Sequence, residues 1–78
     1  MINVRNQQLI DAVGDRVRAV RKEKHLSMEK LAELAGIDYR QVFNIEHGKT
    51  NVTVSTLYNI SRALDMSISE LFDNNTLK

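Results

Sequence analysis

The chain of 78 residues contains no cysteine, no proline and no tryptophan, and it has only two histidines and three glycines. Without cysteine it has neither a disulfide framework nor a thiolate metal site, and the isolated His25 and His47 do not make a zinc ligand set. No apolar run approaches the ~18 residues of a membrane span, and residues 1–6 lack the apolar centre of a signal peptide. We therefore expect one small cytoplasmic domain, 1–78, without metal or cofactor, whose stability depends on its own core.

Charge is balanced overall but unevenly distributed, with 11 basic and 10 acidic side chains giving a net charge of +1. Residues 1–26 hold six basic and three acidic side chains, whereas residues 51–78 hold two basic and three acidic ones. This asymmetry is compatible with one face turned toward phosphate groups. It is equally compatible with solvated helix surfaces, so charge alone does not decide the function.

Hydrophobic periodicity predicts five helices and almost no strand. The first covers residues 7–24, the second begins after Ser27 and ends before Gly36, the third runs from Asp38 to His47, the fourth begins at Thr53 or Ser55, and the fifth opens with a Ser67–Glu70 capping box. The positions expected to face the core are Ile10, Val13, Val17, Val20, Leu31, Leu34, Ala35, Val42, Ile45, Leu57, Ile60, Ala63, Leu64, Ile68, Leu71 and Phe72. The core then spans about residues 12–72, and residues 1–8 and 73–78 are expected to be flexible or to contact a second copy.

Two glycines have specific roles in this scheme. Gly14 lies inside the first predicted helix, where glycine costs about 1 kcal/mol relative to alanine, and a close approach by a neighbouring helix is a reason to keep it. Gly36 is expected to end the second helix in the left-handed conformation. Only Ile37 and Asp38 then separate it from the third helix, a spacing typical of the helix-turn-helix, although many α-hairpins share it.

The residues of this region also carry a family resemblance. Leu31-Ala32, Ala35-Gly36, Ile45-Glu46-His47-Gly48-Lys49, Thr56-Leu57 and Leu71-Phe72 resemble the pattern of the lambda-repressor-like (XRE) helix-turn-helix family. The resemblance covers about residues 12–72. It implies an all-α, five-helix DNA-binding domain that usually acts as a homodimer on a near-palindromic operator.

The third predicted helix supplies the candidates for reading bases. Residues 39, 40, 43, 44 and 47 share the helical face opposite Val42 and Ile45. Arg40 can bond guanine O6 and N7, Asn44 can pair with adenine N6 and N7, and Phe43 can contact a thymine methyl group. Tyr39 can donate to a phosphate or a base. The resemblance places base readers at positions 39, 40 and 44.

Contacts to the DNA backbone are expected from the start of the second helix and from the end of the third. The candidates are Ser27, Met28, His47, Lys49, Thr50 and Asn51. Met28 departs from the glutamine common in the family, which puts that contact in doubt. The family also pairs Arg21 with Glu46 as a structural ion pair, with a phosphate contact by Arg21 as the alternative. His25 stands where glycine is common, so we expect a left-handed backbone there.

The function indicated is a sequence-specific transcriptional regulator, most simply a repressor that occludes an operator as a homodimer. The expected dimer residues are Ile68, Leu71, Phe72 and Leu77, with closure of the monomer core as the alternative for Leu71 and Phe72. Two other functions remain open: a DNA-binding antitoxin, and a protein-interaction module of the same fold. Paired carboxylates, a Ser/His/Asp set and a phosphate-cradling loop are missing, so we expect no enzyme, no small-molecule ligand and no membrane contact, and we expect nucleoid association in a prokaryotic cell.

Overall fold

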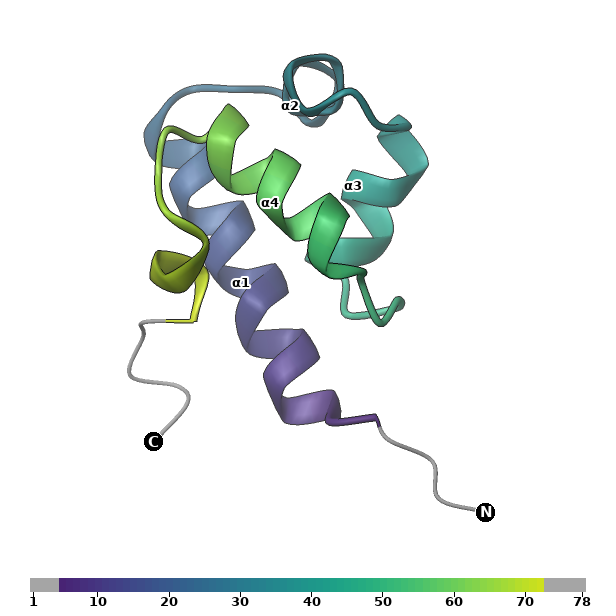
Figure 1. Ribbon diagram of the computed structural model, residues 1–78. Coiled ribbons are helices and arrows are strands. Elements are labelled where there is room, and N and C mark those ends of the chain that lie inside the picture. Colours follow the sequence, from purple (N-terminus) through teal and green to yellow (C-terminus); the bar gives the residue numbers. More distant parts are fainter. Residues whose placement is uncertain (1–4, 73–78) are drawn as a thin grey trace.

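The computed structural model describes residues 5–72, and every regular element in that range is helical. Four α-helices, α1 (Gln7–Glu23), α2 (Met28–Ala35), α3 (Tyr39–Glu46) and α4 (Val54–Ala63), are followed by the 3-10 helix η1 (Ile68–Leu71) (Figure 1). The two ends were expected to be flexible or to contact a second copy. Residues 1–4 and 73–78, which include Leu77, lie outside the described residues. Gln7 and Gln8 already belong to α1. No helix between residues 5 and 72 is long and apolar enough to cross a bilayer.

Side-chain caps determine where the helices begin. Asn6, Ser27 and Thr53 each accept a hydrogen bond from a backbone N–H three residues later, at 3.0, 3.0 and 3.2 Å respectively. Each cap satisfies one of the N–H groups that the first turn of a helix leaves without a partner. Thr53, rather than Ser55, is therefore the cap of α4.

Left-handed backbone follows α1 and α2 where the sequence predicted it, at His25 with φ of 58° and at Gly36 with φ of 70°. Gly48, after α3, adopts the same conformation with φ of 66°. Asp65 adopts the same conformation after α4, with φ of 58°, although no sequence pattern predicted it. Aspartate tolerates this region better than most residues do.

The predicted fifth helix is a 3-10 helix of four residues, not an α-helix. Its capping box is present, with the Ser67 N–H donating to Glu70 at 2.7 Å. The backbone then closes with i to i+3 bonds, Glu70 to Ser67 at 3.1 Å and Phe72 to Ser69 at 3.0 Å. Short 3-10 turns of this kind are frequent as connectors, and this one delivers Leu71 into the core.

The core lies where α1, α2, α3, α4 and η1 meet. Its buried members are Val13, Val17, Val20, Leu31, Ala32, Ala35, Val42, Ile45, Leu57, Ile60, Leu64 and Leu71. Burying each of the large side chains contributes about 1.5–3 kcal/mol. Ala63, Ile68, Leu9 and Met66 are half-buried and pack against this cluster.

Leu34 is a correction to the predicted core, because half of its surface (51 %) is exposed. The buried arc of α2 is formed by Leu31, Ala32 and Ala35. At 100° per residue, Leu34 lies roughly 110° from the middle of that arc. Leu34 therefore lies outside the buried arc and faces solvent.

Candidate nucleic-acid interface

The turn between α2 and α3 is fixed by backbone bonds and by a second capping box. The Ile37 N–H donates to Ala32 at 3.0 Å across the left-handed Gly36. Asp38 then opens α3, with its own N–H donating to the Gln41 side chain at 3.2 Å. The two short helices therefore keep a defined angle, and the outer side of α3 stays free.

The four predicted base readers lie around one shallow hollow. Val42 and Ile45 are buried on the inner side of α3. On the outer side Tyr39 and Arg40 are exposed, and Phe43 and Asn44 are half-buried. Together with Lys49 from the following loop, these four line a single surface depression. A guanidinium, an amide, a phenol and an aromatic ring thus share one helix face that is free to meet a ligand.

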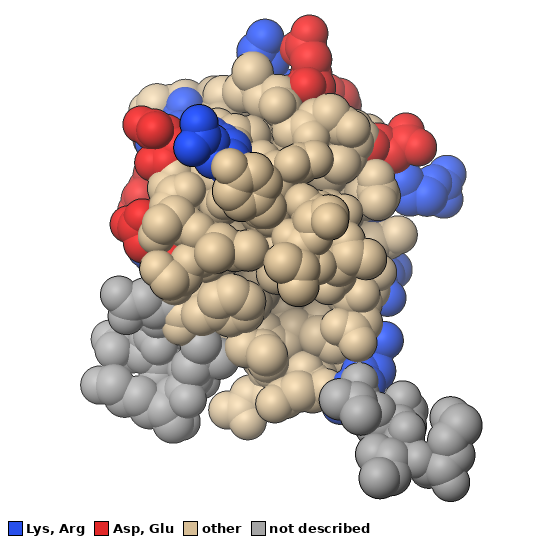
Figure 2. Space-filling view, in the orientation of Figure 1, with Lys and Arg blue, Asp and Glu red and all other residues tan. Residues whose placement is uncertain are grey.

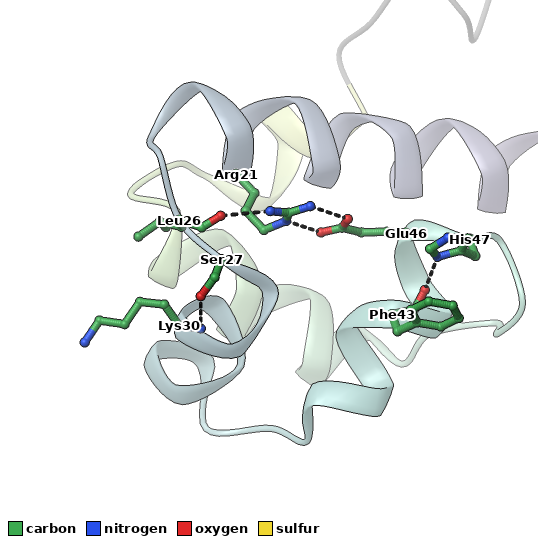
Figure 3. Close-up of polar contacts among 7 residues, drawn as sticks. All are labelled: Arg21, Leu26, Ser27, Lys30, Phe43, Glu46 and His47. Carbon is green, nitrogen blue, oxygen red and sulfur yellow. Dashed lines mark hydrogen bonds and ion pairs between the residues drawn. The ribbon is translucent and has the colours of Figure 1, made fainter.

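The inner side of α3 is held by a buried ion pair to α1. The Arg21 guanidinium donates from Nε and Nη2 to the two oxygens of Glu46 at 2.7 and 2.9 Å, and from Nη1 to the Leu26 carbonyl at 2.8 Å (Figure 3). Both residues are buried, at 8 % and 6 % exposure. The hydrogen bonds to Glu46 raise the pKa of Arg21 above its ordinary value in spite of burial. A buried guanidinium whose three nitrogens each donate within the protein fixes geometry, and here it is engaged away from phosphate.

Close backbone contact at Gly14 brings α1 against the same part of α3. A Cβ at this position would overlap the Ile45 carbonyl oxygen. This is the close helix approach that the sequence predicted for Gly14, and it places the α1 backbone directly behind the last turn of α3.

The end of α3 forms a small aromatic and cationic cluster. The rings of Phe43 and His47 are stacked with centroids 4.0 Å apart, and the Lys49 ammonium lies 5.5 Å from the centre of the Phe43 ring. The Nδ1 atom of His47 lies 2.8 Å from the Phe43 carbonyl oxygen (Figure 3). A carbonyl oxygen only accepts, so Nδ1 carries a proton and donates. The stack limits the motion of Phe43. Periodicity placed residues 43 and 47 on one face, but it did not give the ring geometry or the tautomer.

The other backbone-contact candidates fall in two places. Ser27 and Met28 lie at the start of α2, where the Ser27 hydroxyl is occupied as the cap and Met28 is half-buried against the core. Thr50 and Asn51 lie in the loop after Gly48 and line a groove with Gln41 and Asn44.

Gln7 belongs to this region although no motif pointed to it. Its amide donates to the Gly48 carbonyl oxygen at 2.9 Å and to Asp11 at 2.8 Å. The bond joins the start of α1 to the loop that carries Lys49.

Among the predicted dimer residues, Leu71 requires correction. Its exposure is 0 %, because η1 inserts it between α1 and α4, so no partner can reach it. Ile68 is half-buried against the core, and Phe72 retains 36 % of its surface. Within residues 5–72 there is no group of three His, Cys, Asp or Glu side chains arranged to hold a metal ion.

The helices α2 and α3 are short, capped and joined by a left-handed turn. The second helix is anchored on its inner side and free on its outer side. This arrangement defines a helix-turn-helix domain. The helix-turn-helix family matches residues 17–71, and the chain belongs to this family.

Relatives and solved structures agree with that assignment. The chain is 34 % identical over 68 residues to the control protein C.SmaI of Serratia marcescens, covering 87 % of this chain and 81 % of that protein. It is 35 % identical to the immunity repressor of Bacillus phage phi105, covering 83 % of this chain but only 45 % of the repressor. The restriction-modification controller C.AhdI of Aeromonas hydrophila superimposes with a TM-score of 0.79 at 38 % identity, over 81 % of this chain and 96 % of that one. SinR, a biofilm regulator solved in complex with DNA, gives 0.74 at 37 % identity, over 78 % and 98 %.

Proposed function

We propose that this protein is a sequence-specific transcriptional repressor that binds double-stranded DNA as a homodimer, with α3 in the major groove of a near-palindromic operator. The observation that carries the proposal is the hollow on the outer side of α3, where Tyr39, Arg40, Phe43 and Asn44 lie together on a helix anchored from behind. The family is one of DNA-binding transcriptional regulators rather than of enzymes. The proposed function involves no catalysis, and the 78 residues act as one domain. The protein is proposed to lie in the cytoplasm, and on the nucleoid while it is bound to DNA.

Each side chain of the hollow has a role that follows from its chemistry. The Arg40 fork fits guanine O6 and N7, and the Asn44 amide fits adenine N6 and N7. Phe43, held against His47, offers an apolar surface to a thymine methyl group. Tyr39, with 42 % of its surface exposed, donates to a phosphate or a base at the start of the helix.

The surrounding residues position the protein on the duplex. His47 caps the C-terminal end of α3, and Lys49, Thr50 and Asn51 follow in the loop after Gly48. We assign these four residues to contacts with DNA phosphates. At the start of α2, which Ser27 caps, we assign backbone N–H groups of the first turn to a phosphate contact, with an apolar contact by Met28 beside them.

The size of the domain suits two copies on one face of DNA. Its extents are 38, 25 and 18 Å. The distance between the centres of two copies packed side by side depends on which sides meet. This distance can reach one helical turn of DNA, about 34–36 Å.

The test is selection from a pool of randomised duplexes by the full chain at a low and a high salt concentration. The proposal predicts enrichment of a two-fold symmetric sequence with half-sites about one helical turn apart. Salt-sensitive binding without an enriched sequence would mean that only phosphate contacts operate and would contradict sequence-specific repression. No binding at either salt concentration would favour the protein-interaction or antitoxin function instead.

A further inference from the structure

The loop that follows α3 leaves the helix in a direction set by backbone bonds. The Gly48 N–H donates to the Ile45 carbonyl oxygen at 3.2 Å, and the Lys49 N–H donates to the Asn44 carbonyl oxygen at 2.9 Å. Gly48 itself is left-handed, with φ of 66°. These bonds satisfy carbonyl groups at the end of α3, but neither of them uses the Gly48 carbonyl oxygen, which takes its partner from another helix.

That partner is Gln7, the first residue of α1. Its Nε2 donates to the Gly48 carbonyl oxygen at 2.9 Å and to Oδ1 of Asp11 at 2.8 Å, and its Oε1 accepts from Nε of Arg5 at 3.1 Å. The opposite orientation of the amide would place Oε1 against a carbonyl and a carboxylate oxygen, neither of which donates. The three bonds therefore fix the orientation of this exposed side chain.

Close packing at Gly48 holds the loop against the same two side chains of α1. A Cβ atom at Gly48 would overlap Oδ1 of Asp11 and would lie 3.3 Å from Nε2 of Gln7. Gln7 and Asp11 are four residues apart, so they are neighbours on one side of the helix, and a bond between them stabilises that side. The loop therefore rests on the first two turns of α1 at the residue that precedes Lys49.

The contact lies on a basic part of the molecular surface. Arg5, Arg40 and Lys49 are all exposed. In Figure 2, Lys and Arg side chains follow the lower right edge, from the side of α3 toward the start of α1, whereas the Asp and Glu side chains in this view lie at the left and upper edges. A loop that is fixed before DNA arrives loses less conformational entropy when its groups meet phosphates.

We propose that Gln7 is a positioning residue for DNA binding, which holds the Gly48 carbonyl oxygen and so directs the loop that follows. That loop carries the proposed phosphate contacts Lys49, Thr50 and Asn51. Because the Gln7 amide is engaged within the protein, it supports affinity for all sequences alike and adds no preference for a base. This inference rests on the proposed function for the role of the loop on DNA, whereas the bond to Gly48 exists without DNA.

The experiment is a double-mutant cycle on the full chain, with the wild type, Gln7→Met, Lys49→Ala and the double variant. Fluorescence anisotropy over a salt series measures their affinity for the duplex that the wild type selects. Methionine matches glutamine in helix propensity and lack of charge, but it cannot donate to Gly48. Gln8→Met is the matched control, because Gln8 is the next residue of α1 and is also exposed. Circular dichroism checks that each variant is folded.

Gln7→Met should weaken binding at least about threefold and lower the slope of log affinity against log salt, because the loop no longer holds its cation at a phosphate. Gln8→Met should change neither quantity. In the Lys49→Ala background the effect of Gln7→Met should shrink, since one of the groups that it positions is gone. A residue that only stabilised the fold would lower affinity by the same factor in both backgrounds.

The inference would be overturned if Gln7→Met bound DNA like Gln8→Met, or if its effect were independent of Lys49. Hydrogen exchange of the Lys49 amide without DNA separates this inference from the proposed function, because that N–H donates to Asn44 only while the loop is held. Faster exchange in Gln7→Met, with no DNA binding by the wild type, would refute the repressor proposal but keep the loop contact. DNA binding by the wild type, with exchange and affinity unchanged in Gln7→Met, would refute only the role of Gln7.

Discussion

At the residue scale, the pair of Arg21 and Glu46 determines how α3 is presented. Glu46 ends the helix that carries Arg40 and Asn44, and Arg21 comes from α1, so the two bonds of 2.7 and 2.9 Å join α3 to α1, the longest helix between residues 5 and 72. The family resemblance predicted this pair. The structure adds a third bond, in which Nη1 of Arg21 donates to the Leu26 carbonyl oxygen.

Glu46→Gln should lower the free energy of unfolding by about 3–5 kcal/mol, because it leaves a buried guanidinium without its counter-charge. Urea denaturation checks this. Glu33→Gln is the control, since it breaks the exposed Lys30–Glu33 pair (3.2 Å) and should cost less than about 1 kcal/mol. The double replacement Arg21→Met with Glu46→Leu should recover much of the loss, and an effect of Glu46→Gln no larger than that of Glu33→Gln would contradict the role given to the pair.

At the element scale, the helix ends could be predicted because the residues that determine them form bonds with their near neighbours in the sequence. Ser27, Gly36, Asp38 and Gly48 fix helix ends through their own backbone and side-chain bonds. The choice between an α-helix and a 3-10 helix at residues 68–71 depends instead on how Leu71 meets the core, and a capping box precedes either form equally well.

The candidate site could be predicted in position but not in detail. Periodicity placed residues 39, 40, 43 and 44 on one face, and the structure brings them to one hollow. The stack of Phe43 on His47 joins two positions that periodicity already placed on one face, but their ring geometry depends on side-chain rotamers. The bond from Gln7 to Gly48 joins a helix to a distant loop, for which the sequence carries no local signal.

Gly14→Ala tests the close approach of α1 to α3. In an open helix this change stabilises by about 1 kcal/mol, but here the new methyl group would overlap the Ile45 carbonyl oxygen. We expect a net loss of about 1–3 kcal/mol, as in other overpacked sites, measured by urea denaturation. Ala19→Gly, at an exposed position of the same helix, gives the propensity cost alone. A more stable Gly14→Ala protein would show that the contact is not tight.

The capping box of η1 should make stability depend on pH. Hydrogen bonds from the backbone N–H and the hydroxyl of Ser67 lower the pKa of Glu70. Its ionised form therefore stabilises the fold above the unfolded pKa of about 4.3, and this contribution is lost as the pH falls through the lower folded pKa. Thermal midpoints should show the wild type above Glu70→Gln at neutral pH, with the difference disappearing in acid. A difference that is constant with pH would argue against the ionised cap.

At the scale of the whole molecule, the fold separates anchoring from the proposed reading. The inner side of α3 is held by α1 through Gly14 and Arg21, and its outer side carries the proposed base readers. Because these two roles use opposite sides of one helix, one can be changed without the other.

Lys49→Ala should weaken binding about equally to all DNA sequences, because a phosphate contact carries no base information. The slope of log affinity against log salt should fall by about one unit, the contribution of one neutralised phosphate. Fluorescence anisotropy over a salt series measures it. Arg16→Gln is the control, because it also removes one positive charge. The Arg16 side chain donates to the Glu70 carbonyl on η1 (3.3 Å), and its replacement should leave the slope unchanged. Equal effects of the two variants would mean that Lys49 acts only through general charge.

The most direct test of the account is to compare the sequences selected from randomised duplexes by the wild type and by Arg40→Ala. If α3 reads bases through the hollow, the variant should lose the preference for guanine at one position of each half-site, at a cost of about 1–3 kcal/mol there, and keep the preferences elsewhere. Selected sequences that are identical for both proteins would contradict the reading role of α3.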